Sequence, residues 1–173
     1  MLPIIRAARP DDAAVIAEIH VRSWQVAYRG LMASEFLDAL SVESRRDWWT
    51  RRLSLLDPGH AVLVLEDLSG VAGFSYLGPS HDGDGEVYAI YLHPVQWGRG
   101  HGRRLLTSAE ATLAGAGHER GVLWVLEGND RARRFYEACG WSADGALKLE
   151  EIGHIQVTEM RYRKDLDDRS PIR

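Results

Sequence analysis

The sequence predicts one mixed α/β domain, built on a twisted and mostly antiparallel sheet of about seven strands with flanking helices. Two helical segments come early, three strand-length apolar runs follow them, and helices then alternate with strands. The early strand-to-strand connections contain no helix, as in antiparallel hairpins, whereas helices cross over between the later strands.

The N-terminal third is expected to be mainly helical. A short apolar run over Ile4–Ala7 precedes Pro10 and two aspartates, one of which would serve as a helix N-cap. Apolar residues at helical spacing then predict a helix from about Asp12 to Tyr28. A second helical region extends from Ser34 to Leu56, with a break near Ser41.

The rest of the chain is expected to alternate between strands and helices. Strands are predicted at Ala61–Leu65, Val71–Leu77, Glu86–His93, Val122–Leu126 and Ile155–Tyr162, and helices at Leu105–Ala116 and Arg131–Cys139. Pro94 ends the third of these strands, and Gly140 ends the last helix at its C′ position. The order of elements closes with two strands, of which only the second is placed.

Composition narrows the class of protein. The 173 residues suit one domain, expected over residues 1–166 with a polar tail at 167–173. A formal charge of −4 gives no general attraction to nucleic acid or to acidic membranes. Only two of the 21 basic residues are lysines, so local anion sites would be built from arginine.

The same composition argues against a disulfide-bonded secreted protein, a metal site and a membrane span. The single cysteine, Cys139, excludes an intramolecular disulfide, and the seven histidines show no spacing typical of a metal site. No run approaches the ~20 apolar residues of a membrane span, and the first residues do not resemble a signal peptide. We therefore expect a cytoplasmic protein that binds neither metal nor membrane.

The strongest chemical feature is the segment Trp97-Gly-Arg-Gly-His-Gly-Arg-Arg104, between a strand and a helix. Its glycines let the backbone approach a ligand closely, and the helix N-terminus adds positive charge, so the segment predicts a phosphate or pyrophosphate site. A Walker A loop would need Gly-Lys-Ser/Thr, which is absent. A dinucleotide fingerprint would need glycine where Arg103 stands.

Pro94, then x-x-x-Gly-x-Gly at the start of a helix, resembles the acetyl-CoA motif of the GNAT N-acetyltransferases. The later stretches Leu123–Asn129 and Arg134–Trp141 are similar to the second motif of that family. The resemblance extends from roughly Ile4 to Leu166. It departs from the family at Trp97, because the family usually has Gln or Arg at the head of the loop.

The resemblance implies an acetyl-CoA-dependent enzyme that passes an acetyl group directly to a primary amine of a small molecule or peptide, in a ternary complex. It assigns acetyl-CoA contacts to the main chain of Ile90, Tyr91 and Leu92, to the loop residues Gly98, Arg99, Gly100, His101, Gly102 and Arg103, and to Asn129. Tyr136 would protonate the departing thiolate, and Glu86 lies where some members have a general base.

Alternatives exist for each of these side chains. Tyr136 could be a core aromatic residue, and Asn129 could cap its helix, with Asp130 as the rival cap. Glu127 or a water chain could replace Glu86 as the base. The same fold could also serve a non-catalytic acyl-CoA sensor, and many relatives pair as homodimers.

The acceptor site is expected near the first two helices, where the resemblance places the variable part of the family. Trp24 and Tyr28 are the candidate acceptor-binding residues, and core packing is the alternative role for both. Acidic residues in segments expected to converge there would form an acidic mouth that favours a cationic amine: Asp82, Asp84, Glu86, Glu127 and Asp130.

Overall fold

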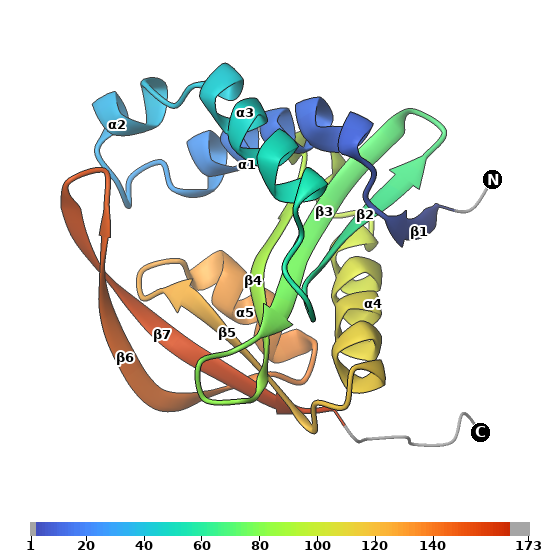
Figure 1. The fold of residues 1–173 in the computed structure, drawn as a ribbon. Helices are drawn as coiled ribbons and strands as arrows, with labels where there is room; N and C mark the ends of the chain where they lie inside the picture. The colour runs from blue at the N-terminus through green and yellow to red at the C-terminus, as the bar shows by residue number, and fades with distance from the viewer. Residues whose placement is uncertain (1–2, 167–173) are drawn as a thin grey trace.

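The computed structural model describes residues 3–166. Its seven strands form one sheet in the order β1-β2-β3-β4-β5-β7-β6, which confirms the predicted fold class (Figure 1). All neighbouring strands are antiparallel except β4 and β5. The strands are β1 (Ile4–Ala7), β2 (Ala61–Asp67), β3 (Gly70–Pro79), β4 (Gly85–Leu92), β5 (Arg120–Leu126), β6 (Ser142–Ile152) and β7 (Ile155–Asp165).

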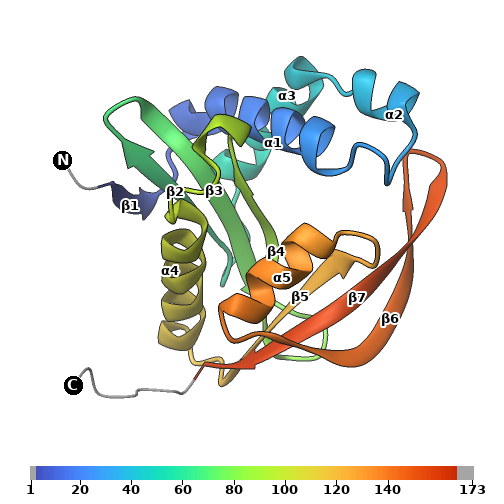
Figure 2. The same cartoon turned by 180° about the vertical axis from the view of Figure 1, so that it is seen from behind.

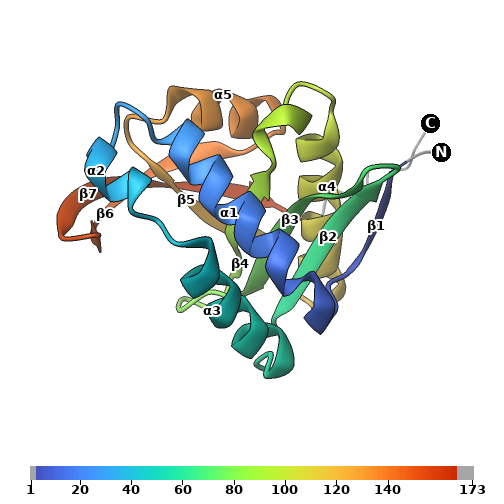
Figure 3. The same ribbon diagram turned by 90° about the horizontal axis from the view of Figure 1, so that it is seen from above.

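Helices cover both faces of this sheet. They are α1 (Ala13–Ala27), α2 (Ser34–Asp38), α3 (Val42–Ser54), α4 (His101–Gly115) and α5 (Asp130–Ala138). Helices α1 and α3 lie on one face, and α4 and α5 lie on the other (Figures 2 and 3). The predicted break in the second helical region is confirmed, because α2 ends at Asp38 and α3 begins at Val42.

Strand β6 is the one of the last two strands whose position the sequence pattern did not predict. It lies at the edge of the sheet and is mostly exposed, with Leu147 and Leu149 among its exposed residues. Its charged and apolar residues therefore have no buried face that would produce a clear alternation. Strand β7 extends beyond the predicted end at Tyr162, as far as Asp165. The predicted polar tail at 167–173 lies outside the described residues.

Strands β4 and β5 separate soon after they meet. They pair only at Gly85 with Gly121 and at Glu86 with Val122. On its other side, β4 stays paired with β3 up to Leu92, but it contains a bulge, since Tyr76 pairs with Ala89 and Leu77 with Val87. Tyr88 is thus an extra residue, and such a bulge bends a strand and increases its twist.

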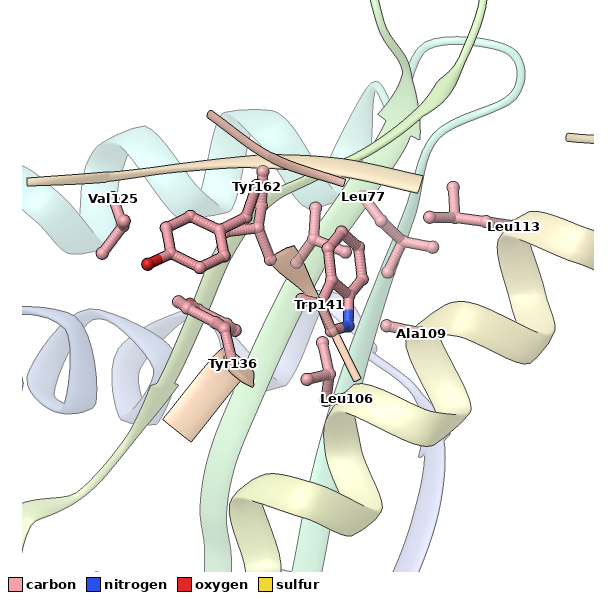
Figure 4. Close-up of a cluster of buried hydrophobic side chains, with 10 residues drawn as sticks. Leu77, Leu106, Ala109, Leu113, Val125, Tyr136, Trp141 and Tyr162 are labelled. Atoms are coloured by element: carbon pink, nitrogen blue, oxygen red, sulfur yellow. The ribbon is translucent and has the colours of Figure 1, made fainter. Parts of the chain in front are cut away.

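A buried cluster holds α4 and α5 against the sheet (Figure 4). Leu106, Ala109 and Leu113 of α4 pack with Trp141, whose indole N–H donates to Glu110 Oε1 at 2.8 Å. Tyr136 of α5 belongs to the same cluster, so it helps to hold α5 against the sheet, and it also lines the cavity of the candidate site.

An ion pair attaches the start of α1 to β1. Arg6 donates to both carboxylate oxygens of Asp12, at 2.7 and 3.0 Å, and the Arg9 amide donates to the same carboxylate at 2.7 Å. Asp12 is buried, and its pKa is lowered chiefly by the Arg6 hydrogen bond. The predicted aspartate precedes α1, but its side chain does not cap that helix, because Arg6 and Arg9 occupy it.

We expect Asp12→Asn to lower the free energy of unfolding by about 2 kcal/mol at neutral pH, because a charged hydrogen bond is lost. The folded-state pKa of Asp12 lies below the ordinary value of 3.8, so this stabilisation is present above that value and is lost as the pH falls through the folded-state pKa. Denaturant unfolding should therefore show a difference at neutral pH that shrinks as the pH falls below 3.8. The exposed Asp11→Asn is the matched control, and a difference independent of pH would contradict the expectation.

Candidate active site

The space between the diverging strands is a cavity of about 280 Å³. Its wall combines the end of α1, strands β4 and β5, Trp97 and Gly102 at the glycine-rich loop, and residues of α5 as far as Tyr136. Of the sequence-predicted residues, the structure brings seven to this wall: Tyr28, Ile90, Tyr91, Leu92, Gly102, Asn129 and Tyr136. Segments distant in sequence therefore meet at one site.

The glycine-rich loop has the conformation that its glycines permit. Gly98 and Gly100 have φ values of 78° and 79°, in the left-handed region, and Gly100 is the N-cap of α4. Gly102 has a different constraint, because a Cβ there would lie 3.3 Å from two ring atoms of Phe135. The loop thus brings backbone N–H groups to a helix N-terminus close beside α5.

The side chains of this loop are oriented in different directions. His101 is buried, with Nε2 3.9 Å from Asp67 Oδ2, so its side chain belongs to the protein interior. Arg103 donates to the carbonyl of Ala138 at 2.8 Å. Arg99 is exposed. Any anion site at this loop would therefore depend first on backbone N–H groups.

Tyrosine hydroxyls gather in the cavity. Tyr136 is buried, lines the cavity, and packs against Phe135 and Tyr162 with ring centroids 5.2 and 6.2 Å apart. Burial raises the pKa values of Tyr28, Tyr91 and Tyr136 above the ordinary value for tyrosine. All three hydroxyls therefore remain protonated at neutral pH and are available as proton donors. Tyr136 combines the core position and the site position that the sequence left as alternatives.

Asn129 has both of the positions that the sequence allowed. Its Oδ1 accepts a hydrogen bond from the Ala132 amide at 3.1 Å, so it is the N-cap of α5, and the residue also lines the cavity. The rival cap, Asp130, instead forms an ion pair with Arg133 at 3.4 Å.

Glu86 lies at the point where β4 and β5 part. It is half-buried, and burial raises the pKa of its carboxyl group; nearby Glu159 raises it further, whereas Lys148 lowers it. Glu86 does not line the cavity itself, but the next residue, Val87, does. The competing Glu127 is exposed at the end of β5.

Three polar or aromatic residues near Glu86 were missed from sequence. Lys148 of β6 forms an ion pair with Glu159 of β7 at 3.0 Å, and its Nζ lies 4.7 Å from the centroid of the Trp124 ring of β5. Trp124 lines the cavity. These residues come from three strands that only the folded sheet brings together, so the sequence gives no local signal for them.

The two candidate acceptor-binding aromatics differ in position. Tyr28 lines the cavity, whereas Trp24 is packed behind it, with its ring centroid 5.1 Å from that of Tyr28. The Trp24 indole N–H is buried and has no hydrogen-bond partner within residues 3–166. Trp24 thus supports Tyr28 and does not itself form the wall.

The expected acidic mouth does not form at the cavity, because none of its five carboxylates lines the wall. Asp82 pairs with Arg161 at 3.4 Å, and Asp84 pairs with Arg120 and Arg163, each at 3.3 Å. Asp130 also pairs with Arg133, so three of the five carboxylates face arginines.

No group of three or more histidine, cysteine, aspartate or glutamate side chains in the part of the chain that the structure describes could hold a metal ion. None of the helices there is long and apolar enough to cross a membrane.

The cavity between two parting strands has a glycine-rich helix N-terminus at its rim and protonated tyrosines in its wall, an arrangement that suits an elongated ligand with an anionic end. Residues 15–141 match the Acetyltransferase (GNAT) family. The chain therefore belongs to this family and is an N-acetyltransferase.

Individual relatives agree with this assignment. The uncharacterized N-acetyltransferase YuaI of Bacillus subtilis is 35% identical over 139 residues, which are 78% of this chain and 77% of YuaI. The L-amino acid N-acyltransferase MnaT of Escherichia coli is 27% identical over 141 residues, covering 79% of this chain and 78% of MnaT. The solved structure of yncA from Salmonella typhimurium with its cofactor acetyl-CoA has a TM-score of 0.71 at 24% identity, and the match covers 100% and 99% of the two chains.

The loop geometry predicts opposite effects of one substitution at the two ends of α4. Gly100→Ala should lower the free energy of unfolding by about 1 kcal/mol, because φ there is 79°. Gly115→Ala should raise it by about 0.5 kcal/mol, because that glycine lies in the helix with open space around its Cβ position. Thermal and denaturant unfolding of both variants would check this, and stabilisation by Gly100→Ala would contradict the loop conformation.

Proposed function

We propose that this N-acetyltransferase uses acetyl-CoA and transfers the acetyl group directly to a primary amine of a small molecule or peptide, within a ternary complex. The observation that carries the proposal is the cavity between β4 and β5, which has the glycine-rich loop at its rim and Tyr136 in its wall. The cofactor named for yncA and the acyltransferase activity named for MnaT support it.

The residues present fit such a cofactor. Because β4 pairs with β5 only as far as Glu86, the main-chain groups of Ile90 and the Leu92 amide that face away from β3 have no strand partner, whereas the Leu92 carbonyl accepts the Trp97 indole N–H at 3.0 Å. Unpaired backbone groups of this kind require hydrogen bonds from ligand or water, and the amide-rich arm of CoA would supply them. The loop from Gly98 to Arg103 would bind the diphosphate through its N–H groups, and Asn129 would contact the arm.

Acetyl-CoA supplies a thioester, so the reaction requires one proton at the departing sulfur and the removal of one from the amine. Tyr136 would donate the first of these, because burial keeps its hydroxyl protonated at neutral pH. The bond between the amine nitrogen and the acetyl carbon forms as the carbon–sulfur bond breaks, with no acyl-enzyme between them. This direct route needs no nucleophilic side chain.

Glu86 would remove the proton from the amine, directly or through a water molecule. Its raised pKa makes it a better base than an ordinary carboxylate, although it must be ionised to act. Tyr28 and Trp124 would form the acceptor side of the wall. A single domain over residues 1–166, a cytoplasmic location and a possible homodimer stay predictions.

Tyr136→Phe should lower kcat about 100-fold while leaving CoA affinity nearly unchanged, because only a proton donor is lost. Free-thiol release over an amine panel gives kcat, and calorimetric titration gives affinity. The control is Tyr162→Phe, a buried tyrosine of the same cluster whose hydroxyl donates to Glu137 at 2.8 Å. That variant should lose stability but keep kcat.

The same assays separate the enzyme from an acyl-CoA sensor. Unchanged kcat in Tyr136→Phe would remove Tyr136 from the mechanism. Saturable acetyl-CoA binding with no thiol release for any amine in a wide panel would instead favour a sensor of the same fold.

Glu86→Gln should reduce kcat/KM about 100-fold at neutral pH. Because the carboxylate form is the active base, wild-type activity should fall as the pH drops through the raised pKa of Glu86, and the variant should lack that limb. Any pH dependence that remains would report the amine of the acceptor. Glu127→Gln is the matched comparison, and loss of the acidic limb in that variant alone would transfer the role to Glu127.

A further inference from the structure

Trp97 and Arg131 form a stacked pair at the rim of the cavity. The guanidinium carbon of Arg131 lies 3.4 Å from the centroid of the Trp97 ring. Trp97 immediately precedes the glycine-rich loop, and Arg131 lies in the first turn of α5, so the pair joins two segments 34 positions apart (131 minus 97). Both residues line the cavity.

The tryptophan is fixed by a second contact. Its indole N–H donates to the carbonyl of Leu92 at 3.0 Å, where β4 ends. The indole therefore has no donor left for a ligand. Its ring face instead provides a platform that holds the guanidinium.

The guanidinium of Arg131 keeps its hydrogen-bonding capacity. Stacking uses the flat face of the group and leaves the N–H donors at its edge. Within residues 3–166 Arg131 forms neither an ion pair nor a hydrogen bond, whereas Arg133 on the same helix pairs with Asp130 and donates to Tyr162. Arg131 is exposed, and the partial desolvation of its guanidinium lowers its pKa without neutralising it. Arg131 is thus a positioned cation without an anion.

We propose that Arg131, oriented by Trp97, binds the diphosphate of the cofactor from α5, beside the glycine-rich loop. The inference rests on the proposed use of acetyl-CoA. A planar fork of N–H donors matches phosphate oxygens in a bidentate way. The loop offers backbone N–H groups from α4, and Arg131 offers its fork from α5, so the anion is bound between two helices. Trp97 is a positioning residue and does not bind the anion itself.

Calorimetric titration at low ionic strength tests this assignment with CoA, with 3′-dephospho-CoA and with pantetheine, which lacks the diphosphate. Arg131→Ala should weaken binding of both CoA and 3′-dephospho-CoA about tenfold or more, as expected for a lost charged hydrogen bond. Pantetheine binding at millimolar concentration should not change. Arg134→Ala removes the same charge from an exposed position of α5 outside the cavity wall and should leave all three affinities unchanged.

Each other result contradicts the proposal in a distinguishable way. Weakening of CoA alone would place Arg131 at the 3′-phosphate, and equal weakening of all three ligands would show that it only shapes the channel for the arm. Unchanged CoA binding in Arg131→Ala would remove it from the site. If the wild-type protein binds none of these ligands, the proposed function itself fails.

A second pair of variants tests the stack. Trp97→Phe retains an aromatic face and should keep most of the affinity, whereas Trp97→Ala should weaken CoA and 3′-dephospho-CoA binding in parallel with Arg131→Ala. Combining Trp97→Ala with Arg131→Ala should add little to the single change, because both remove one contact. Additive losses would show that the two residues act separately. Thermal unfolding of every variant checks that α5 and the loop are intact.

Discussion

The separation of β4 from β5 is the constraint on which the site depends. The two strands share only two residue pairs, yet each stays paired along its other side, β4 with β3 apart from the bulge at Tyr88, and β5 with β7 throughout. The sheet therefore remains continuous at one end and opens at the other. The main-chain groups that face the opening must find partners outside the sheet, and for this reason the cavity suits a ligand rich in amide groups.

Ion pairs stabilise the end of the sheet where β4 and β5 are still paired. Asp84 directly precedes β4 and pairs with Arg120, the first residue of β5, and with Arg163 of β7. These pairs tie three strands together where β4 and β5 meet. Beyond them, the bulge at Tyr88 turns β4 away, and bulky aromatic side chains occupy the space between the layers. The carboxylates that sequence reasoning assigned to the acceptor site are thus partly a structural clamp.

The features predictable from sequence are those determined by local pattern. Helix periodicity located α1, the break before α3 and the short α5, and apolar runs located the central strands. The loop from Gly98 to Gly102 was also recognisable, because its function depends on backbone geometry and glycine records that directly. Strand β6 escaped detection because an exposed edge strand has no buried face.

Side-chain pairing across the fold was not predictable. The acidic mouth failed because counting carboxylates in the sequence says nothing of the arginines that face them. Lys148, Glu159 and Trp124 meet only after three strands are aligned, and Trp97 meets Arg131 only after α5 packs beside the loop. The sequence shows that Trp97 stands where the family usually has Gln or Arg, but without the fold nothing indicates which group would stack on it.

Burial shifts the pKa values of the ionisable groups around the cavity in the same direction. Burial raises the pKa values of the three tyrosines and of Glu86, so the site favours neutral side chains. In the proposed transfer, this preference for neutral side chains suits Tyr136, which must hold its proton until the sulfur departs. It is unfavourable for Glu86, which must be ionised to accept a proton from the amine. Lys148 lowers the pKa of Glu86 and Glu159 raises it, and the two are themselves paired at 3.0 Å. The Lys148–Glu159 ion pair therefore modulates the pKa of Glu86 without adding net charge. An ammonium group of the acceptor would favour the ionised form of Glu86 when it binds, which is when the base is needed.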